Sequence, residues 1–246
     1  MSRISLELVP DVKQIEVSVP HLRSFSSYVS VINIPDLPDR FSVRSWEACA
    51  SEQFSEFSRI AHVRASDCDP DNPLPFADAV NEGTVTELLV VSGDHLSLFR
   101  KQYTSTVFDV LKRIRNELPQ ILVYAAFDPY RTNIHDEIMY TERKIEAGFD
   151  GLFTQPFFNL NLLRFYQELF SDKKIYWGLC PVIADGSRSY WEKRNKVIFP
   201  HGFKTTLDWN IKFGRDFLKF VNDTRGNVYI MPIRIPLQTY LPGIFG

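Results

Sequence analysis

The sequence has few cysteines and no long apolar stretch. Cys49, Cys68 and Cys180 are the only cysteines among 246 residues, and no two of them form a CxxC pair. An odd number of widely spaced cysteines argues against a disulfide framework and favours a reducing compartment. No window reaches the apolar length of a membrane span, and the N-terminal segment MSRISLELVP lacks the apolar core of a signal peptide. The sequence therefore predicts a cytoplasmic protein without a membrane partner.

An excess of charge of one sign is also lacking. Lys and Arg together number 28, Asp and Glu number 30, and the net charge is −2. Such a balance predicts no nucleic-acid partner. No predicted strand is followed by GxGxxG or GxxxxGK[ST], which argues against a Rossmann or P-loop nucleotide site. His62, Asp67 and Cys68 are close in sequence but match no common zinc spacing, so no metal site is predicted.

Eight apolar segments have the length of β-strands. They cover residues 4–9, 28–34, 60–65, 87–91, 121–126, 151–154, 174–180 and 227–231. Segments with helical periodicity separate most of them, at residues 42–59, 76–82, 104–118, 134–147, 160–170, 187–196 and 206–222. Residues 11–25 are poorly periodic and predict one short helix cut at Pro20. This alternation, without any internal linker, predicts a single-domain (β/α)8 barrel over residues 1–246, with an open doubly wound sheet as the alternative.

Polar residues recur at the C-terminal ends of the predicted strands, where such barrels hold their active sites. The candidates are Glu7, His62, Asp94, Phe127, Asp128, Gln155 and Arg234. Two carboxylates there could divide acid and base work, and a glutamine could pair with the edge of a heterocycle. An arginine suits a carboxylate or phosphate, and Phe127, Phe157 and Phe158 stand where a flat ring could stack. Glu7 has an equally weighted structural interpretation, as a buried carboxylate paired with a lysine or arginine.

Seven segments carry a resemblance to a known family. In chain order they are ISLELVP, HVRASD, VVSGD, YAAFDP, ERKIEAGFDGLFTQPFF, GLCPV and YIMPIR. Together they resemble the methylenetetrahydrofolate reductase family over nearly the whole chain. The fifth segment is the most specific, because the family repeats its basic pair, its Ala-Gly step and its Thr-Gln ending with two phenylalanines. The resemblance implies a (β/α)8 barrel that holds FAD and reduces 5,10-methylenetetrahydrofolate to 5-methyltetrahydrofolate with NADH or NADPH, in one-carbon metabolism and methionine biosynthesis.

The resemblance also assigns roles to individual residues. Glu7 matches the acid that helps protonate the substrate nitrogen, and Asp94 matches the aspartate beside flavin and pterin; these two form the predicted catalytic set. The predicted substrate-binding set is Gln155, which matches the pterin-binding glutamine, with Phe157 and Arg234. The predicted FAD-binding set is His62, Gly93, Asp94, Phe127, Arg131, Glu137, Arg143 and Lys144. Arg143 and Lys144 would pair with the negative charge of the FAD pyrophosphate.

The sequence departs from the family at three flavin-side positions. Ser92 stands in place of an arginine, Phe127 in place of a tyrosine, and Arg131 in place of a histidine. Arg131 is expected to supply the phosphate contact that Ser92 cannot make. Two other interpretations stay open: a flavin-free folate one-carbon enzyme, such as a methyl-transfer partner of a corrinoid protein, and a non-catalytic folate-binding subunit. A homo-oligomer or a partner subunit is compatible with all three.

Overall fold

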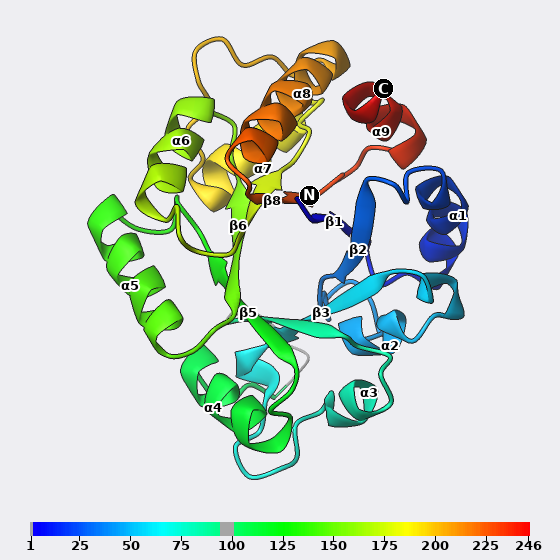
Figure 1. Cartoon of the computed structure of the whole chain (residues 1–246), viewed down its shortest axis with the longest axis vertical. Coiled ribbons are helices and arrows are strands. Elements are labelled where there is room, and N and C mark those ends of the chain that lie inside the picture. Colours follow the sequence, from blue (N-terminus) through cyan, green and yellow to red (C-terminus); the bar gives the residue numbers. More distant parts are fainter. Residues whose placement is uncertain (1, 94–100) are drawn as a thin grey trace.

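A closed barrel of parallel strands forms the centre of the molecule (Figure 1). The computed structural model describes residues 2–93 and 101–246, and within these ranges eight strands follow one another around the barrel. They are β1 (Ile4–Glu7), β2 (Val29–Ile34), β3 (Ser58–Arg64), β4 (Glu87–Val91), β5 (Leu122–Phe127), β6 (Gly151–Pro156), β7 (Ile175–Leu179) and β8 (Asn227–Ile230). Each strand pairs with its sequence neighbours, and the pairing of β8 with β1 closes the ring. The predicted (β/α)8 barrel is confirmed.

Helices surround the barrel on its outer side (Figure 1). In chain order they are α1 (Val12–Arg23), α2 (Ser45–Cys49), α3 (Ala77–Asn81), α4 (Val107–Glu117), α5 (Ile134–Glu146), α6 (Leu160–Leu169), α7 (Asp185–Asn195), α8 (Leu207–Asp223) and α9 (Leu237–Phe245). Two short 3-10 helices, η1 (Glu52–Phe54) and η2 (Ala65–Asp67), flank β3. No helix in the described ranges is both long enough and apolar enough to cross a bilayer.

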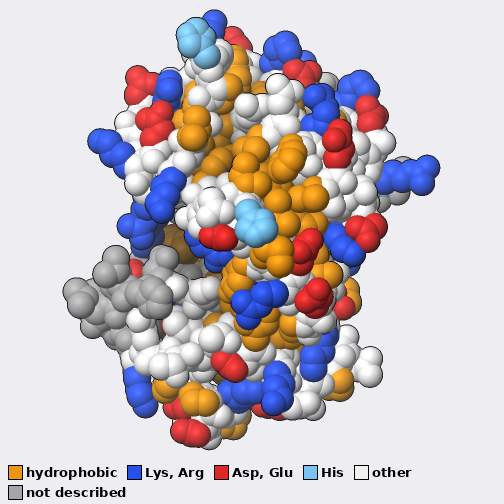
Figure 2. Space-filling view, turned by 90° about the vertical axis from the view of Figure 1, so that its left-hand side faces the viewer, with side chains coloured by type: hydrophobic (Ala, Val, Ile, Leu, Met, Phe, Trp, Pro, Cys, Tyr) orange, Lys and Arg blue, Asp and Glu red, His pale blue; other side chains and the backbone are white. Residues whose placement is uncertain are grey.

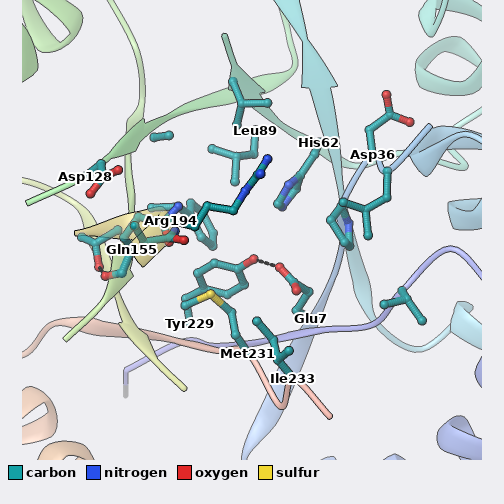
Figure 3. Close-up of a pocket in the computed structure, with 18 of the residues that line it drawn as sticks. Glu7, Asp36, His62, Leu89, Asp128, Gln155, Arg194, Tyr229, Met231 and Ile233 are labelled. Carbon is teal, nitrogen blue, oxygen red and sulfur yellow. Dashed lines mark hydrogen bonds between the residues drawn. The ribbon is translucent and has the colours of Figure 1, made fainter. Parts of the chain in front are cut away.

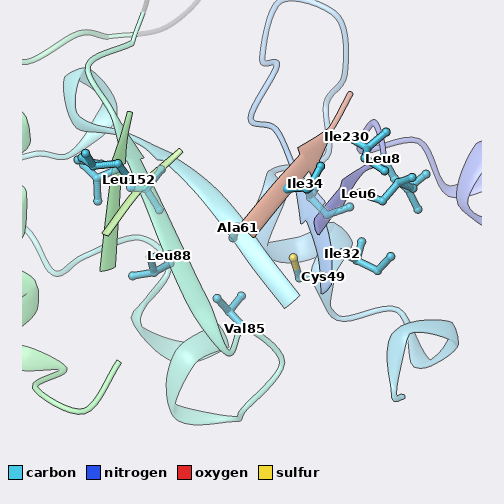
Figure 4. Packing of buried hydrophobic residues seen from close by; sticks show 14 of the residues in the cluster. Leu6, Leu8, Ile32, Ile34, Cys49, Ala61, Val85, Leu88, Leu152 and Ile230 are labelled. Carbon is cyan, nitrogen blue, oxygen red and sulfur yellow. The ribbon is translucent and has the colours of Figure 1, made fainter. Parts of the chain in front are cut away.

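The alternation of side chains along the strands divides the core into two layers. Outward-facing residues, among them Leu6, Ile32 and Leu152, form a large apolar cluster beneath the helices (Figure 4). Inward-facing residues, among them Tyr124 and Tyr229, form a second cluster inside the barrel. The face on which a strand residue lies therefore decides whether it can reach the mouth.

The N-terminal end of the barrel is closed by a polar cluster. Arg3 Nη2 lies 2.6 Å from Glu87 Oε1, and the Tyr124 hydroxyl donates to Glu87 Oε2 at 2.5 Å. Lys174 Nζ donates to Tyr124 Oη at 2.7 Å, and Arg3 also donates to Tyr176 Oη at 2.9 Å. These contacts pair the buried carboxylate of Glu87 with donors on several sides, as a buried charge requires.

The predicted break at Pro20 was wrong, because α1 is one continuous helix that contains this residue. The helix begins at Asp11, whose side chain accepts hydrogen bonds from two backbone amides of the first turn. Val19 and Leu22 are buried against the barrel, whereas Pro20 lies on the exposed side. The carbonyl of Glu16, which loses its helical partner at Pro20, is therefore on the side where water can replace it.

Two further segments differ from the prediction. The predicted helix over residues 42–59 was wrong: this segment contains α2, η1 and the first residues of β3. The helix ends before Ser51, which has an extended ψ of 125°, and serine side chains compete for the backbone bonds that a helix needs. The C-terminal helix α9 was not predicted. Its apolar residues nevertheless follow helical spacing, at Leu237, Tyr240, Leu241 and Ile244.

The side of the molecule that carries α5 and α6 has an apolar band bordered by charged side chains (Figure 2). Exposed apolar residues on these two helices are Ile134, Met139, Phe165 and Leu169. The predicted homo-oligomer or partner subunit stays a prediction.

Candidate active site

Two adjoining cavities lie at the C-terminal ends of the strands, and Figure 3 shows residues that line the larger one. The larger one, here the central pocket, has a volume of about 570 Å³ and is lined by Glu7, Gln155, Tyr229 and residues of α7. The smaller one, here the side pocket, has a volume of about 380 Å³ and is lined by Gly93, Arg131 and Lys144. Both pockets share the lining residues Pro35, Asp36, Leu37, His62, Arg64, Val91, Ala126, Asp128 and Gln155. The two pockets are therefore neighbouring parts of one hollow at the barrel mouth.

Glu7 lies in the central pocket and is bound by a tyrosine rather than by a cation. The Tyr229 hydroxyl, on β8, donates a hydrogen bond to Glu7 Oε2 (Figure 3). Burial raises the pKa of Glu7 to about 7, and the bond from Tyr229 opposes this rise. Near neutral pH the carboxyl group therefore exists in both protonation states, as a proton donor requires. The structural interpretation with a lysine or arginine partner was wrong.

His62 stands on the inner face of β3 and lines both pockets. Its Nε2 is buried and has no hydrogen-bond partner among the described residues. Burial lowers the pKa of His62 to about 3, so the ring is neutral at pH 7. A neutral imidazole with a buried, unpaired nitrogen can donate or accept one hydrogen bond from a ligand.

Asp128 and Gln155 lie side by side at the ends of β5 and β6 and line both pockets. Asp128 was a sequence candidate without an assigned role, and Gln155 was predicted to bind substrate. Burial raises the pKa of Asp128 above its usual range. The amide of Gln155 makes no hydrogen bond within the described residues. Both side chains are therefore available to a ligand.

The rings of Phe127 and Phe157 pack against other aromatic rings. Phe127 is fully buried and packs against Tyr166 and Phe170, with ring centroids 5.0 and 5.9 Å away. Phe157 is also fully buried and packs against Tyr166, 5.9 Å away, in the outer apolar cluster. Both rings pack in the outer apolar cluster. Phe127 is nevertheless among the residues that line the central pocket, so its contact with a cofactor stays a prediction, whereas Phe157 lines neither pocket. Phe158 packs against Trp191, 5.7 Å away.

The predicted basic pair on α5 divides between two environments. Lys144 is buried, lines the side pocket and donates from Nζ to the Ala126 carbonyl at 2.5 Å. Burial lowers its pKa to about 8. Arg143 instead lies exposed over the ring of Phe108, 5.4 Å from its centroid, and lines neither pocket. Neighbouring helix residues point about 100° apart, so both could not face the same cavity.

Arg131 and Glu137 form an ion pair beside the side pocket. Arg131 Nη2 lies 2.6 Å from Glu137 Oε2, and Glu137 Oε1 also accepts from the Asp128 backbone amide at 3.2 Å. Glu137 is buried and lines neither pocket, whereas Arg131 lines the side pocket. Glu137 therefore holds Arg131 in place and does not itself reach a ligand.

The remaining predicted residues lie at the rim or outside the described ranges. Arg234 is exposed at the central pocket and has the left-handed φ of 58°, which costs energy for a residue with a side chain. Gly93 also has a positive φ, 92°, and an added Cβ would lie 2.2 Å from Ser66 Oγ. A larger residue would be strained by this φ and would displace the Ser66 side chain, so the side-pocket wall favours glycine here. Asp94 lies outside the described residues.

Sequence reasoning missed Tyr229, Arg64 and one face of α7. Arg64 follows His62 by two residues on the inner face of β3, and its Nε lies 3.3 Å from Asp67 Oδ1. The α7 residues that line the central pocket are Ser187, Tyr190, Trp191, Arg194 and Asn195. Their helical spacing was visible in the sequence, but nothing there indicated which helix face meets the pocket. No group of three metal-ligating side chains comes together in the described ranges.

Comparisons with family models and with curated proteins gave no match. Solved structures of similar shape include two enzymes that match most of this chain. A 2,3-dimethylmalate lyase of the PEP mutase/isocitrate lyase superfamily matches 99% of this chain and 76% of its own, at a TM-score of 0.57 and 10% identity. A GH10 endoxylanase from a sugarcane soil metagenome matches 94% of this chain and 84% of its own chain. Its TM-score is 0.57 and its sequence identity is 12%. At such identities the likeness shows the barrel fold alone.

Proposed function

We propose that the protein is an oxidoreductase of the methylenetetrahydrofolate reductase type, which reduces 5,10-methylenetetrahydrofolate to 5-methyltetrahydrofolate with NADH or NADPH and bound FAD. The observation that carries the proposal is the pair of adjoining pockets. The central pocket contains an acid, Glu7, whose pKa of about 7 suits proton donation, and the side pocket contains cationic side chains. A reaction between a bound cofactor and a substrate needs two neighbouring sites of this kind. The resemblance of the sequence to the family indicates that the cofactor is FAD and the substrate a folate.

The side pocket fits an anionic, planar cofactor in part. The buried unpaired Nε2 of His62 needs a partner that a cofactor heteroatom can supply. Lys144 and Arg131 bring positive charge that suits phosphate groups. Bound FAD would carry a hydride equivalent from the nicotinamide to the folate. His62, Gly93, Arg131 and Lys144 would hold it, and Arg143 would not.

The residues of the central pocket would act on the folate. Glu7 would give its proton to the nitrogen that leaves the methylene carbon, so that the five-membered ring opens to an iminium. Tyr229 would orient the carboxyl group and limit the rise of its pKa. Gln155 would bind the pterin edge, and the exposed Arg234 would bind the carboxylate tail at the rim.

A flavin-free folate one-carbon enzyme is the second candidate function. It is favoured by the ion pair that engages Arg131, by the position of Arg143 outside the pocket and by Ser92 in place of a family arginine. An absorption spectrum of the purified protein, before and after incubation with FAD and removal of excess, distinguishes the two. Stoichiometric bound flavin is expected. Absence of binding at any FAD concentration would favour the second candidate.

A further inference from the structure

The register of the barrel pairs Asp128 with Gln155. Phe127 of β5 and Thr154 of β6 are the last aligned partners of the two strands. The residues that follow them are Asp128 and Gln155, respectively. Aligned residues on neighbouring strands lie about 4.8 Å apart and point to the same face. The ring of Phe127 faces outward, so Asp128 and Gln155 both face the pockets. Figure 3 shows the two side chains together on one side of the mouth, opposite Glu7 and His62.

These two side chains retain unused hydrogen-bonding capacity. Asp128 Oδ1 accepts from the backbone amide of Tyr130 at 2.9 Å, and its Oδ2 accepts no hydrogen bond among the described residues. The Gln155 amide has no partner in those ranges either. Asp128 is largely enclosed by protein, and burial raises its pKa. Both residues are half-buried and line the two pockets, so Asp128 Oδ2 and the Gln155 amide can bind a ligand that enters there.

We propose that Asp128 determines specificity for the 2-amino-4-oxopyrimidine edge of a pterin, which it binds together with Gln155. This inference rests on the proposed function for the identity of the substrate. Along that edge the 2-amino group and N3–H are adjacent donors, and the 4-oxo group is an acceptor. A carboxylate accepts two adjacent N–H groups, and the amide NH₂ of Gln155 donates to the oxo group. The order of donors and acceptors on the two side chains is therefore complementary to the ring.

Removal of a single ring substituent tests this pairing. Binding of 5-methyltetrahydrofolate and of its 2-desamino-2-methyl analogue is measured by calorimetry for the wild type, for Asp128→Asn and for Asp172→Asn. The last variant is a matched control, because Asp172 is exposed, pairs with its neighbour Lys173 and lines neither pocket. Asparagine keeps the shape of aspartate and an acceptor for the Tyr130 amide, but loses the charge.

The wild type should bind the parent folate at least tenfold more tightly than the analogue. Asp128→Asn should lose at least tenfold affinity for the parent, about 1.4 kcal/mol, and less than twofold for the analogue. Asp172→Asn should match the wild type with both. Equal losses for both ligands, or unchanged affinity in Asp128→Asn, would overturn the pairing. If that variant does not fold, a wild type that fails to discriminate between the ligands would overturn it as well.

The same samples separate this inference from the proposed function. The wild type could bind the parent folate in an Asp128-dependent manner but not reduce 5,10-methylenetetrahydrofolate. This result would support the pairing of Asp128 with the pterin and contradict the proposed reductase function. If the wild type reduces the folate and Asp128→Asn binds normally, the pairing falls alone. A wild type that binds neither ligand would overturn both.

Discussion

Replacing Glu7 by glutamine removes the proton that the folate half of the proposed reaction needs. Glutamine keeps the size of the side chain and still accepts the hydrogen bond from the Tyr229 hydroxyl, so the pocket keeps its shape. A positioned general acid contributes about 10²–10⁴-fold, or about 3–5 kcal/mol of activation free energy. We therefore expect Glu7→Gln to slow folate reduction by about this factor.

Flavin reduction by NADH or NADPH needs no proton from Glu7 and should be unchanged in the variant. Stopped-flow absorbance under anaerobic conditions measures the two half-reactions separately. In the wild type, the folate half-reaction should fall as the pH rises through about 7, because burial places the pKa of Glu7 there. Equal losses in both half-reactions of Glu7→Gln would refute the role of Glu7 as the proton donor.

The raised pKa of Glu7 also predicts how the free energy of unfolding depends on pH. Its pKa is about 7 in the folded protein against 4.5 for an ordinary glutamate, so the folded state binds this proton more tightly than the unfolded state. This contribution to the free energy of unfolding is complete below about pH 4.5 and is lost as the pH rises to about 7. At about 1.36 kcal/mol per pH unit the difference of about 2.5 between the two pKa values sets an upper limit of about 3.4 kcal/mol on the loss, and the loss is smaller because the carboxyl group faces the pocket. Glu7→Gln should therefore melt higher than the wild type at pH 8.5, and the advantage should vanish at pH 4.5.

Three other substitutions test the remaining parts of the site. Lys144→Met should lower the flavin-to-protein ratio while Arg143→Met leaves it unchanged, because only Lys144 lines the side pocket; equal ratios in the two variants would contradict this. Tyr229→Phe should raise the pKa of Glu7 and move the falling limb of the folate half-reaction to higher pH, since the lost bond opposes that rise; a shift to lower pH would be inconsistent. Gln155→Ala should weaken binding of 5-methyltetrahydrofolate by about 1–3 kcal/mol in a titration, because a buried polar partner is left unpaired; unchanged affinity would assign Gln155 a structural role.

The barrel could be predicted from the sequence because its strands and most of its helices leave strong local patterns. The inward or outward side of each strand residue could not, since both faces of a parallel barrel strand are apolar and hydropathy does not alternate along it. Phe127 and Asp128 follow each other in sequence, yet the ring of Phe127 packs against Tyr166 of α6, whereas Asp128 lines both pockets. The strand ends could therefore be identified from the sequence, whereas the direction of the Phe127 ring could not.

Two features of the site depend on contacts that local sequence does not encode. Tyr229 meets Glu7 across 222 positions, only because β8 closes the ring onto β1. Arg143 and Lys144 were treated as a unit, although the helix turns them toward solvent and toward the side pocket respectively. Register and helix rotation, which place these side chains, are set by the packing of the whole barrel.

The most direct test of the proposed function is the product of a single anaerobic reaction. Wild-type protein is supplied with FAD, NADH or NADPH, and 5,10-methylenetetrahydrofolate, and the folates are separated by chromatography, with Glu7→Gln as the matched control. The proposed function predicts 5-methyltetrahydrofolate in amounts equal to the nicotinamide oxidised, and little or none with the variant. A wild type that forms no 5-methyltetrahydrofolate with either nicotinamide would contradict it.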